Sequence, residues 1–107
     1  MKILLDENIP RKLKSLFNEF QVETPLSLGW DGKKDGELLG MMVLNGFDVF
    51  ITMDKSLRHQ QNLSKFPLMI FLIKAVNNHY ETVKPHILEI IRILQSQNWE
   101  VKLIEIG

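Results

Sequence analysis

A chain of 107 residues is long enough to bury one hydrophobic core and too short to bury two. It has no cysteine, which excludes disulfides, thiolate metal sites and cysteine nucleophiles and favours a reducing, cytoplasmic location. Thirteen basic and thirteen acidic side chains cancel, so the total charge does not indicate a nucleic-acid or membrane partner. The first ten residues turn acidic too soon for a signal peptide, and no apolar run approaches the roughly 20 residues that span a bilayer. We therefore expect a single domain, residues 1–107, without a membrane span.

The spacing of apolar residues indicates strands and helices that alternate along the chain. In order, it predicts a strand at residues 2–5, a helix at 9–20, a brief strand around Val22, a loop, a helix at 34–45, a strand at 47–52, a turn into a short helix at 53–63, a strand at 66–73, a helix at 80–97 and an alternating edge strand at 99–106. Asn8 should cap the first helix, and Gly46 should end the second. This alternation favours an α/β fold, a three-layer sandwich with a mostly parallel central sheet of four to five strands.

Acidic residues stand where two of the predicted strands end. Asp6 follows the first strand, and Asp54 follows the strand that ends at Thr52. In an open parallel sheet, functional groups gather just beyond the carboxyl ends of the strands. Asp35 begins the helix that leads back into the Thr52 strand, so it should lie at the same edge of the sheet. We therefore expect Asp6, Asp35 and Asp54 to converge.

Carboxylates that converge at neutral pH repel one another unless a divalent cation neutralises them. Mg²⁺ or Mn²⁺ binds through a few carboxylates plus waters and phosphate oxygens, and it promotes in-line displacement at phosphorus. The three acids therefore point to phosphodiester hydrolysis. Basic residues that could hold a polyanion flank each acid in the sequence: Arg11 and Lys12, Lys33 and Lys34, and Lys55 and Arg58.

Each acid also has a purely structural explanation. Asp6 and Asn8 could cap a helix or complement its dipole. Asp35 and Glu37 lie in the first turn of a predicted helix, where acids are favoured anyway, and Asp54 could cap the short helix that follows it. A functional site is favoured by the coincidence of three acids at one predicted sheet edge, and not by any one of them.

Two longer stretches combine these residues into motifs. "LLDENIP" has an apolar strand followed by Asp6 and, two places on, the small polar Asn8. In "KDGELLGMMVLNGFDVFITMDKSL", Asp35 begins a helix and a strand ends in Thr-x-Asp at Thr52 and Asp54. With the runs "GWDGKKDGELL" and "HQQN", the whole chain resembles the PIN-like nuclease domain family in its compact, toxin–antitoxin-associated (VapC-like) branch.

The resemblance implies a Mg²⁺- or Mn²⁺-dependent endoribonuclease, the toxin of a toxin–antitoxin pair, which acts on RNA and is held inactive by a cognate antitoxin protein. It makes Asp6, Asp35 and Asp54 the metal ligands and catalytic residues. Related toxins carry a further acid on an early helix that this chain lacks. The supporting residues would be Asn8, Glu37 and Thr52, and the substrate-binding residues would be Arg11, Lys34, Lys55 and Arg58.

Two other functions stay open. A receiver-like phosphoacceptor domain also places acids after its first strand and a single Asp after a later one, with a Lys after a strand, here Lys74; the sheet order expected from the sequence does not suit it. A catalytically silent PIN-like module would only present charge to RNA or to a protein. The edge strand at 99–106 suits pairing with a second chain, so a homodimer is compatible with each function.

Overall fold

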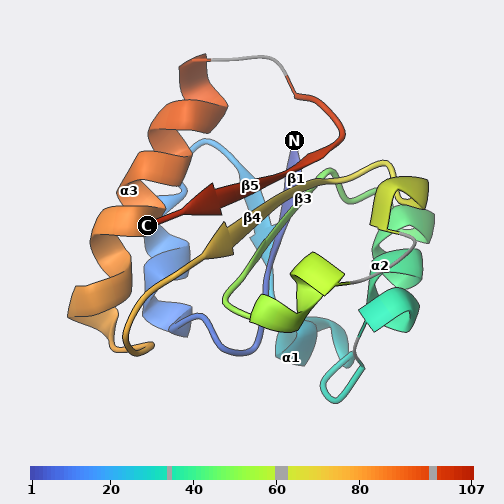
Figure 1. The fold of residues 1–107 in the computed structure, drawn as a ribbon, viewed down its shortest axis with the longest axis horizontal. Coiled ribbons are helices and arrows are strands. Elements are labelled where there is room, and N and C mark those ends of the chain that lie inside the picture. The colour runs from blue at the N-terminus through green and yellow to red at the C-terminus, as the bar shows by residue number, and fades with distance from the viewer. Residues whose placement is uncertain (34, 60–62, 97–98) are drawn as a thin grey trace.

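The computed structural model describes residues 1–33, 35–59, 63–96 and 99–107, except for the side chain of Asp35 (Figure 1). Its elements in chain order are β1 (Lys2–Leu5), η1 (Arg11–Leu16), β2 (Gln21–Glu23), α1 (Pro25–Leu28), α2 (Asp35–Leu44), β3 (Val49–Thr52), η2 (Lys55–His59), η3 (Leu63–Lys65), β4 (Met69–Ile73), α3 (Tyr80–Ser96) and β5 (Lys102–Ile106). The elements labelled η are 3₁₀ helices.

The five strands form one sheet in the order β2-β1-β3-β4-β5, and all four neighbouring pairs are parallel. The predicted α/β class and parallel sheet are therefore confirmed. The two central strands β3 and β4 are buried along their whole length, which explains why they read as continuous apolar runs in the sequence. Strand β5 lies at the edge, as its alternating pattern predicted.

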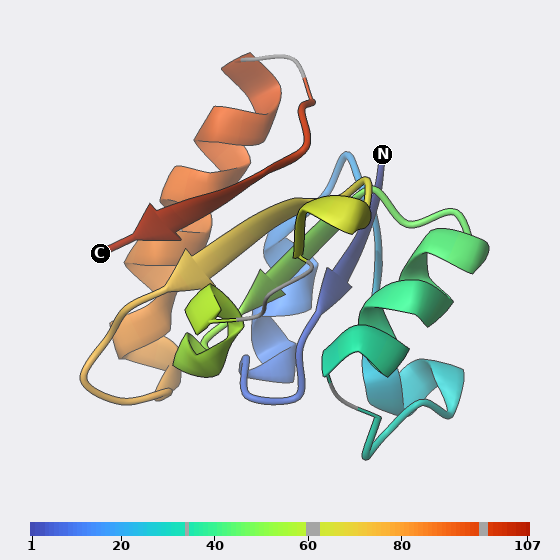
Figure 2. The same cartoon turned by 45° about the vertical axis from the view of Figure 1, so that its right-hand side comes forward.

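Helices cover both faces of the sheet and make three layers (Figure 2). Because side chains alternate across a strand, Ile3 and Leu5 of β1 pack on one face and Leu4 on the other. The first face is covered by η1 and α3, and its core contains Leu13 of η1. The second face is covered by α2 and η2, and its core contains Leu57 of η2.

The predicted helix at 9–20 is the element that differs most from expectation. It is a six-residue 3₁₀ helix, and its N-cap position is held by Pro10, which makes no side-chain capping bond. The prediction that Asn8 caps it was wrong, because the Asn8 Oδ1 accepts a hydrogen bond from the backbone N–H of Met53 instead (3.2 Å). A contact across the sheet edge has replaced a local one.

Two further boundaries follow from local chemistry. The predicted loop after Val22 contains the four-residue helix α1, whose first turn is closed by a reciprocal capping box between Thr24 and Ser27. Helix α2 ends as predicted at Gly46, which has a φ of 78° that a side chain would strain. Within the described residues, no helix combines the length and apolar character needed to cross a membrane.

Candidate functional site

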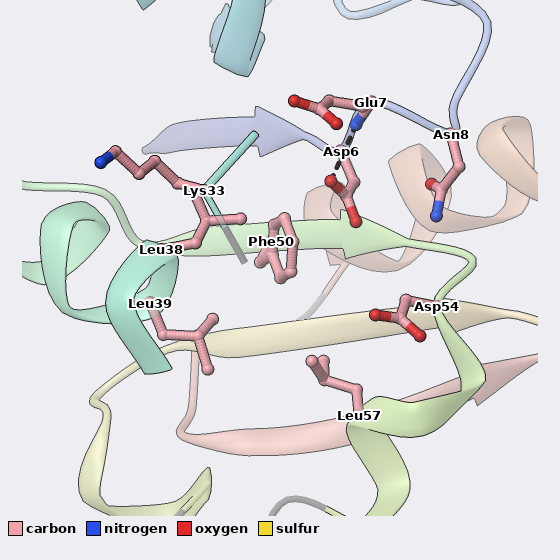
Figure 3. A pocket seen from close by; sticks show the side chains of 9 residues that line it. All are labelled: Asp6, Glu7, Asn8, Lys33, Leu38, Leu39, Phe50, Asp54 and Leu57. Carbon is pink, nitrogen blue, oxygen red and sulfur yellow. Dashed lines mark hydrogen bonds between the residues drawn. The ribbon is translucent and has the colours of Figure 1, made fainter. Parts of the chain in front are cut away.

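A cavity of about 340 Å³ opens at the carboxyl edge of the sheet, on the face covered by α2 (Figure 3). The chain passes from β1 to β2 on one side and then returns to β3 on the other side of β1, so the direction of strand order reverses between β1 and β3. This is the place where open α/β sheets bind ligands. The lining residues are Asp6, Glu7, Asn8, Lys33, Leu38, Leu39, Phe50, Asp54 and Leu57.

Asp6 is the first residue after β1, and its side chain extends toward the end of β3 (Figure 3). Its backbone N–H continues the ladder by donating to the Ile51 carbonyl at 2.9 Å. Its Oδ1 accepts from the Glu7 backbone N–H at 2.8 Å. Burial raises the pKa of Asp6 above the ordinary aspartate value, against the lowering effect of its hydrogen bonds, and the charges of Glu7 and Asp54 raise it further. The fold thus holds a carboxylate where ionisation is unfavourable.

Thr52, the last residue of β3, connects the two acids. Its side chain is completely buried, and its hydroxyl donates to the Asp6 Oδ2 at 2.6 Å. The Thr52 Oγ1 also accepts a hydrogen bond from the backbone N–H of Asp54 at 3.0 Å. Since both hydrogen-bonding functions of the hydroxyl are used, Thr52 sets the position of Asp6 and of the backbone that carries Asp54.

Asp54 lies two residues beyond β3 and lines the same cavity as Asp6. Its Oδ1 accepts from both the backbone N–H (3.0 Å) and the hydroxyl (2.7 Å) of Ser56 at the start of η2. Asp54 therefore makes the hydrogen bonds expected of a residue that caps the following helix. This capping does not exclude a second role, because these bonds use only one of the two carboxylate oxygens.

Asn8 and Glu7 hold the loop after β1 in place. The Asn8 Oδ1 bonds to Met53 N–H, and its backbone carbonyl accepts from the Asn78 side-chain amide at 3.2 Å. The Glu7 Oε1 accepts the Gly32 backbone N–H at 2.8 Å, which ties the loop before α2 to the end of β1. Asn8 therefore acts as a positioning residue whose oxygen is already engaged.

Asp35 begins α2, and its side chain lies outside the described part of the structure. Two residues near the start of this helix, Leu38 and Leu39, line the cavity, so the backbone start of α2 lies at the predicted edge. The side chain of Glu37, predicted as a supporting residue, is 62% exposed; its Oε1 lies 3.8 Å from the Lys33 Nζ, and Glu37 is not among the residues that line the cavity.

The predicted basic residues are spread around the site. Lys34 lies outside the described residues. Arg11 borders an adjoining cavity with Asp6 and Glu7, whereas Lys55 lies exposed in η2. Arg58 stands 4.0 Å from Glu105 of β5. Among the described residues, the cation that lines the acid cavity is Lys33, one of the basic residues near Asp35 that the sequence suggested could hold a polyanion.

The donor atoms of the cavity suit a hard cation. They are carboxylate oxygens, the ligands that Mg²⁺ and Mn²⁺ prefer. Asp6 and Asp54 keep unused lone pairs on the cavity side, and Mg²⁺ is commonly bound through one or two carboxylates with waters completing its shell. Among the residues that the structure describes, no three acidic or histidine side chains are grouped closely enough to hold a metal ion on their own. The described site thus provides two candidate ligands.

Sequence reasoning did not identify Ser56 or Asn78, which position Asp54 and the Asp6 loop. Ser56 had a local signal, since Asp-x-Ser before a helix is a capping pattern. Asn78 had none, because its partner Asn8 is 70 residues away in the chain. Comparison with protein-family models, with curated proteins and with solved structures found no match to this chain.

Proposed function

We propose that this protein is a metal-dependent endoribonuclease of the PIN-like type, with Asp6 and Asp54 as its central acids. The observation that carries the proposal is their arrangement: carboxylates from the ends of β1 and β3 line one cavity at the switch point of a parallel sheet, and the buried Thr52 hydroxyl bonds to the Asp6 carboxylate and to the backbone N–H of Asp54. Asp6 is held where its charged form is disfavoured, as is common at functional sites. A divalent cation would offset that cost.

The residues of the site would bind the metal ion, orient its ligands and contact the substrate. Asp6 and Asp54 would hold Mg²⁺ or Mn²⁺, with Asp35 as a third ligand, and the bound ion would supply positive charge to the phosphodiester group. Thr52 keeps the Asp6 carboxylate oriented, and Asn8 holds the loop that carries it. Lys33 lines the cavity and would contact a phosphate oxygen. The RNA substrate, a toxin role and a cognate antitoxin remain parts of this proposal.

The test is cleavage of labelled RNA by the purified protein with Mg²⁺ or Mn²⁺. Asp6→Asn and Asp54→Asn should each lower the rate by at least about 100-fold, since removing even a supporting group of a metal site costs 10- to 100-fold. Glu89→Gln on the exposed side of α3 removes one negative charge far from the cavity and should leave the rate unchanged. Undiminished cleavage by either aspartate variant would refute the assignment.

A second candidate function, a receiver-like phosphoacceptor, is favoured by the sheet order. The expectation that the order would not suit a receiver was wrong, because β2-β1-β3-β4-β5 is the order of flavodoxin-like and receiver folds. The acids after β1 and the single Asp54 after β3 are also where that function needs them. However, Lys74 follows β4 and its Nζ pairs with the Glu105 Oε1 at 3.2 Å, so the structure pairs this ammonium with Glu105.

Acetyl phosphate separates the two candidates. A receiver should gain one phosphoryl group on Asp54 in Mg²⁺, detected by mass spectrometry, and Asp54→Asn should not. A nuclease should cleave RNA and gain no phosphoryl group. If the protein does neither and shows no affinity for Mn²⁺, the silent binding module is the remaining function.

A further inference from the structure

A second cavity, broad and open, lies on the other face of the sheet between η1 and the start of α3. It has a volume of about 850 Å³, and its lining residues are Arg11, Lys12, Lys14, Ser15, Phe17, Asn18 and Tyr80. Three of these are cations and none is an acid. Because the whole chain has no net charge, this concentration of positive charge is a local feature.

The cations of this cavity are not neutralised within the fold. Across residues 1–33, 35–59, 63–96 and 99–107, no carboxylate forms an ion pair with Arg11, Lys12 or Lys14. All three side chains are exposed. The 3₁₀ geometry of η1 contributes, because side chains three residues apart eclipse one another in such a helix and Arg11 and Lys14 therefore share one side. The lysines are available to a phosphate group.

An aromatic ring stands beside these cations. Tyr80 is the first residue of α3, is half-buried against the core and lines the cavity with one part of its surface. The Nζ of Lys84, one turn later, lies 5.7 Å from the centre of its ring. Cations along a groove together with an aromatic side chain are the combination that binds single-stranded nucleic acid, the cations through phosphates and the ring through an unpaired base.

A third cavity, of about 450 Å³, adjoins both the acid cavity and the basic cavity. It shares Asp6 and Glu7 with the acid cavity and Arg11 with the basic one. The bond from Asn78 to the Asn8 carbonyl holds the chain just before α3 against the loop that carries Asp6. The start of α3 is thereby held close to the loop that follows Asp6.

We propose that the cavity between η1 and α3 is a binding subsite for single-stranded RNA, with Lys12 and Lys14 on phosphates and Tyr80 under a base. Arg11 binds the RNA where it passes from this subsite to the acid cavity. Only that last step rests on the proposed nuclease function, because the subsite needs neither a metal nor the acids to bind.

The test measures binding apart from cleavage. The probe is a fluorescein-labelled oligouridylate of about 12 nucleotides, within the range that single-strand-binding domains cover, in EDTA so that no cleavage occurs. Anisotropy titrations over a salt series give the slope of log K against log salt. Lys12→Gln/Lys14→Gln should reduce the magnitude of this slope by about 1.4, since each single-strand phosphate contact contributes about 0.7.

A matched control separates this site from charge in general. Lys65→Gln/Lys102→Gln removes the same charge from η3 and from the edge strand β5; neither lysine lines the basic cavity, so this variant should leave the slope unchanged. Tyr80→Leu should weaken binding about tenfold because the base loses its stacking partner, whereas Tyr80→Phe should bind like wild type. Circular dichroism confirms that each variant is folded.

The outcomes distinguish the two proposals. Equal slopes for the two double variants, or undiminished binding by folded Tyr80→Leu, would overturn the subsite and leave the nuclease proposal standing. If Asp6→Asn and wild type both bind the oligouridylate in EDTA and neither cleaves RNA in Mg²⁺, the nuclease proposal fails while the subsite stands. No binding by wild type at low salt would also overturn the subsite.

Discussion

Replacing Thr52 by valine tests the connection between the two central acids. Valine has nearly the shape of threonine, so Thr52→Val removes the hydroxyl without opening a cavity in the fully buried site. The 2.6 Å bond to the Asp6 carboxylate is charge-assisted and contributes about 1.5–3 kcal/mol. The part-buried N–H of Asp54 also loses its acceptor, which costs about 1 kcal/mol. We expect a total loss of about 3 kcal/mol, a large share of the 5–15 kcal/mol typical of a domain.

Urea denaturation followed by circular dichroism measures this loss, with Thr52→Ser as the matched control. Serine keeps both hydrogen bonds and loses one buried methyl group, which costs about 1 kcal/mol. The pH dependence adds a second readout. The Thr52 bond favours the charged form of Asp6 and so lowers its pKa. The cost of Thr52→Val should therefore grow as the pH rises through the pKa of Asp6.

The reasoning would be refuted if Thr52→Val and Thr52→Ser had free energies of unfolding within about 0.5 kcal/mol of each other at neutral pH, the usual spread of neutral surface changes. A Thr52→Val cost that did not change between acid and neutral pH would show that the bond does not depend on the charge of Asp6.

Three further predictions follow from the same site. Burial raises the pKa of Asp6, so the folded protein loses stability as the pH rises from the ordinary aspartate pKa through this raised value. Without divalent ions, the free energy of unfolding from urea denaturation should therefore fall more over that pH range for wild type than for Asp6→Asn. Equal falls for the two proteins would contradict this. Mg²⁺ at 100 times its Kd should raise the free energy of unfolding of wild type by about 2.7 kcal/mol, measured by thermal unfolding. An equal rise for Asp54→Asn at the same Mg²⁺ concentration would exclude Asp54 as a ligand. Asn8→Ala should cost about 1 kcal/mol because Met53 N–H loses its acceptor, whereas Asn8→Asp, which keeps one, should cost less in the same urea assay.

Sequence patterns were sufficient for the parts of this protein that depend on local chemistry. Continuous apolar runs identified the buried strands β3 and β4, and the position of Gly46 after an apolar helix identified its end. Parallel strands place all their carboxyl ends at one edge of the sheet, so the acids at the ends of β1 and β3 could be assigned to the same edge from their positions alone.

Contacts between distant parts of the chain could not be predicted in this way. Asn8 has the composition of a helix cap, yet it bonds to Met53, 45 residues away, because that N–H lies at the end of a neighbouring strand. The helix predicted at residues 9–20 is instead the shorter 3₁₀ helix η1, which packs against α3. Local periodicity contains no information about such partners.

By itself, the sequence determined that this protein is an α/β domain with Asp6 and Asp54 at one sheet edge. Only the tertiary structure decided that β1 and β3 are neighbours, that Thr52 joins the two acids, and that the cations of η1 meet Tyr80 of α3. The physical reason is that strand order and helix packing are set by how whole elements bury their apolar faces against one another, which is a property of the assembled layers and not of any single segment.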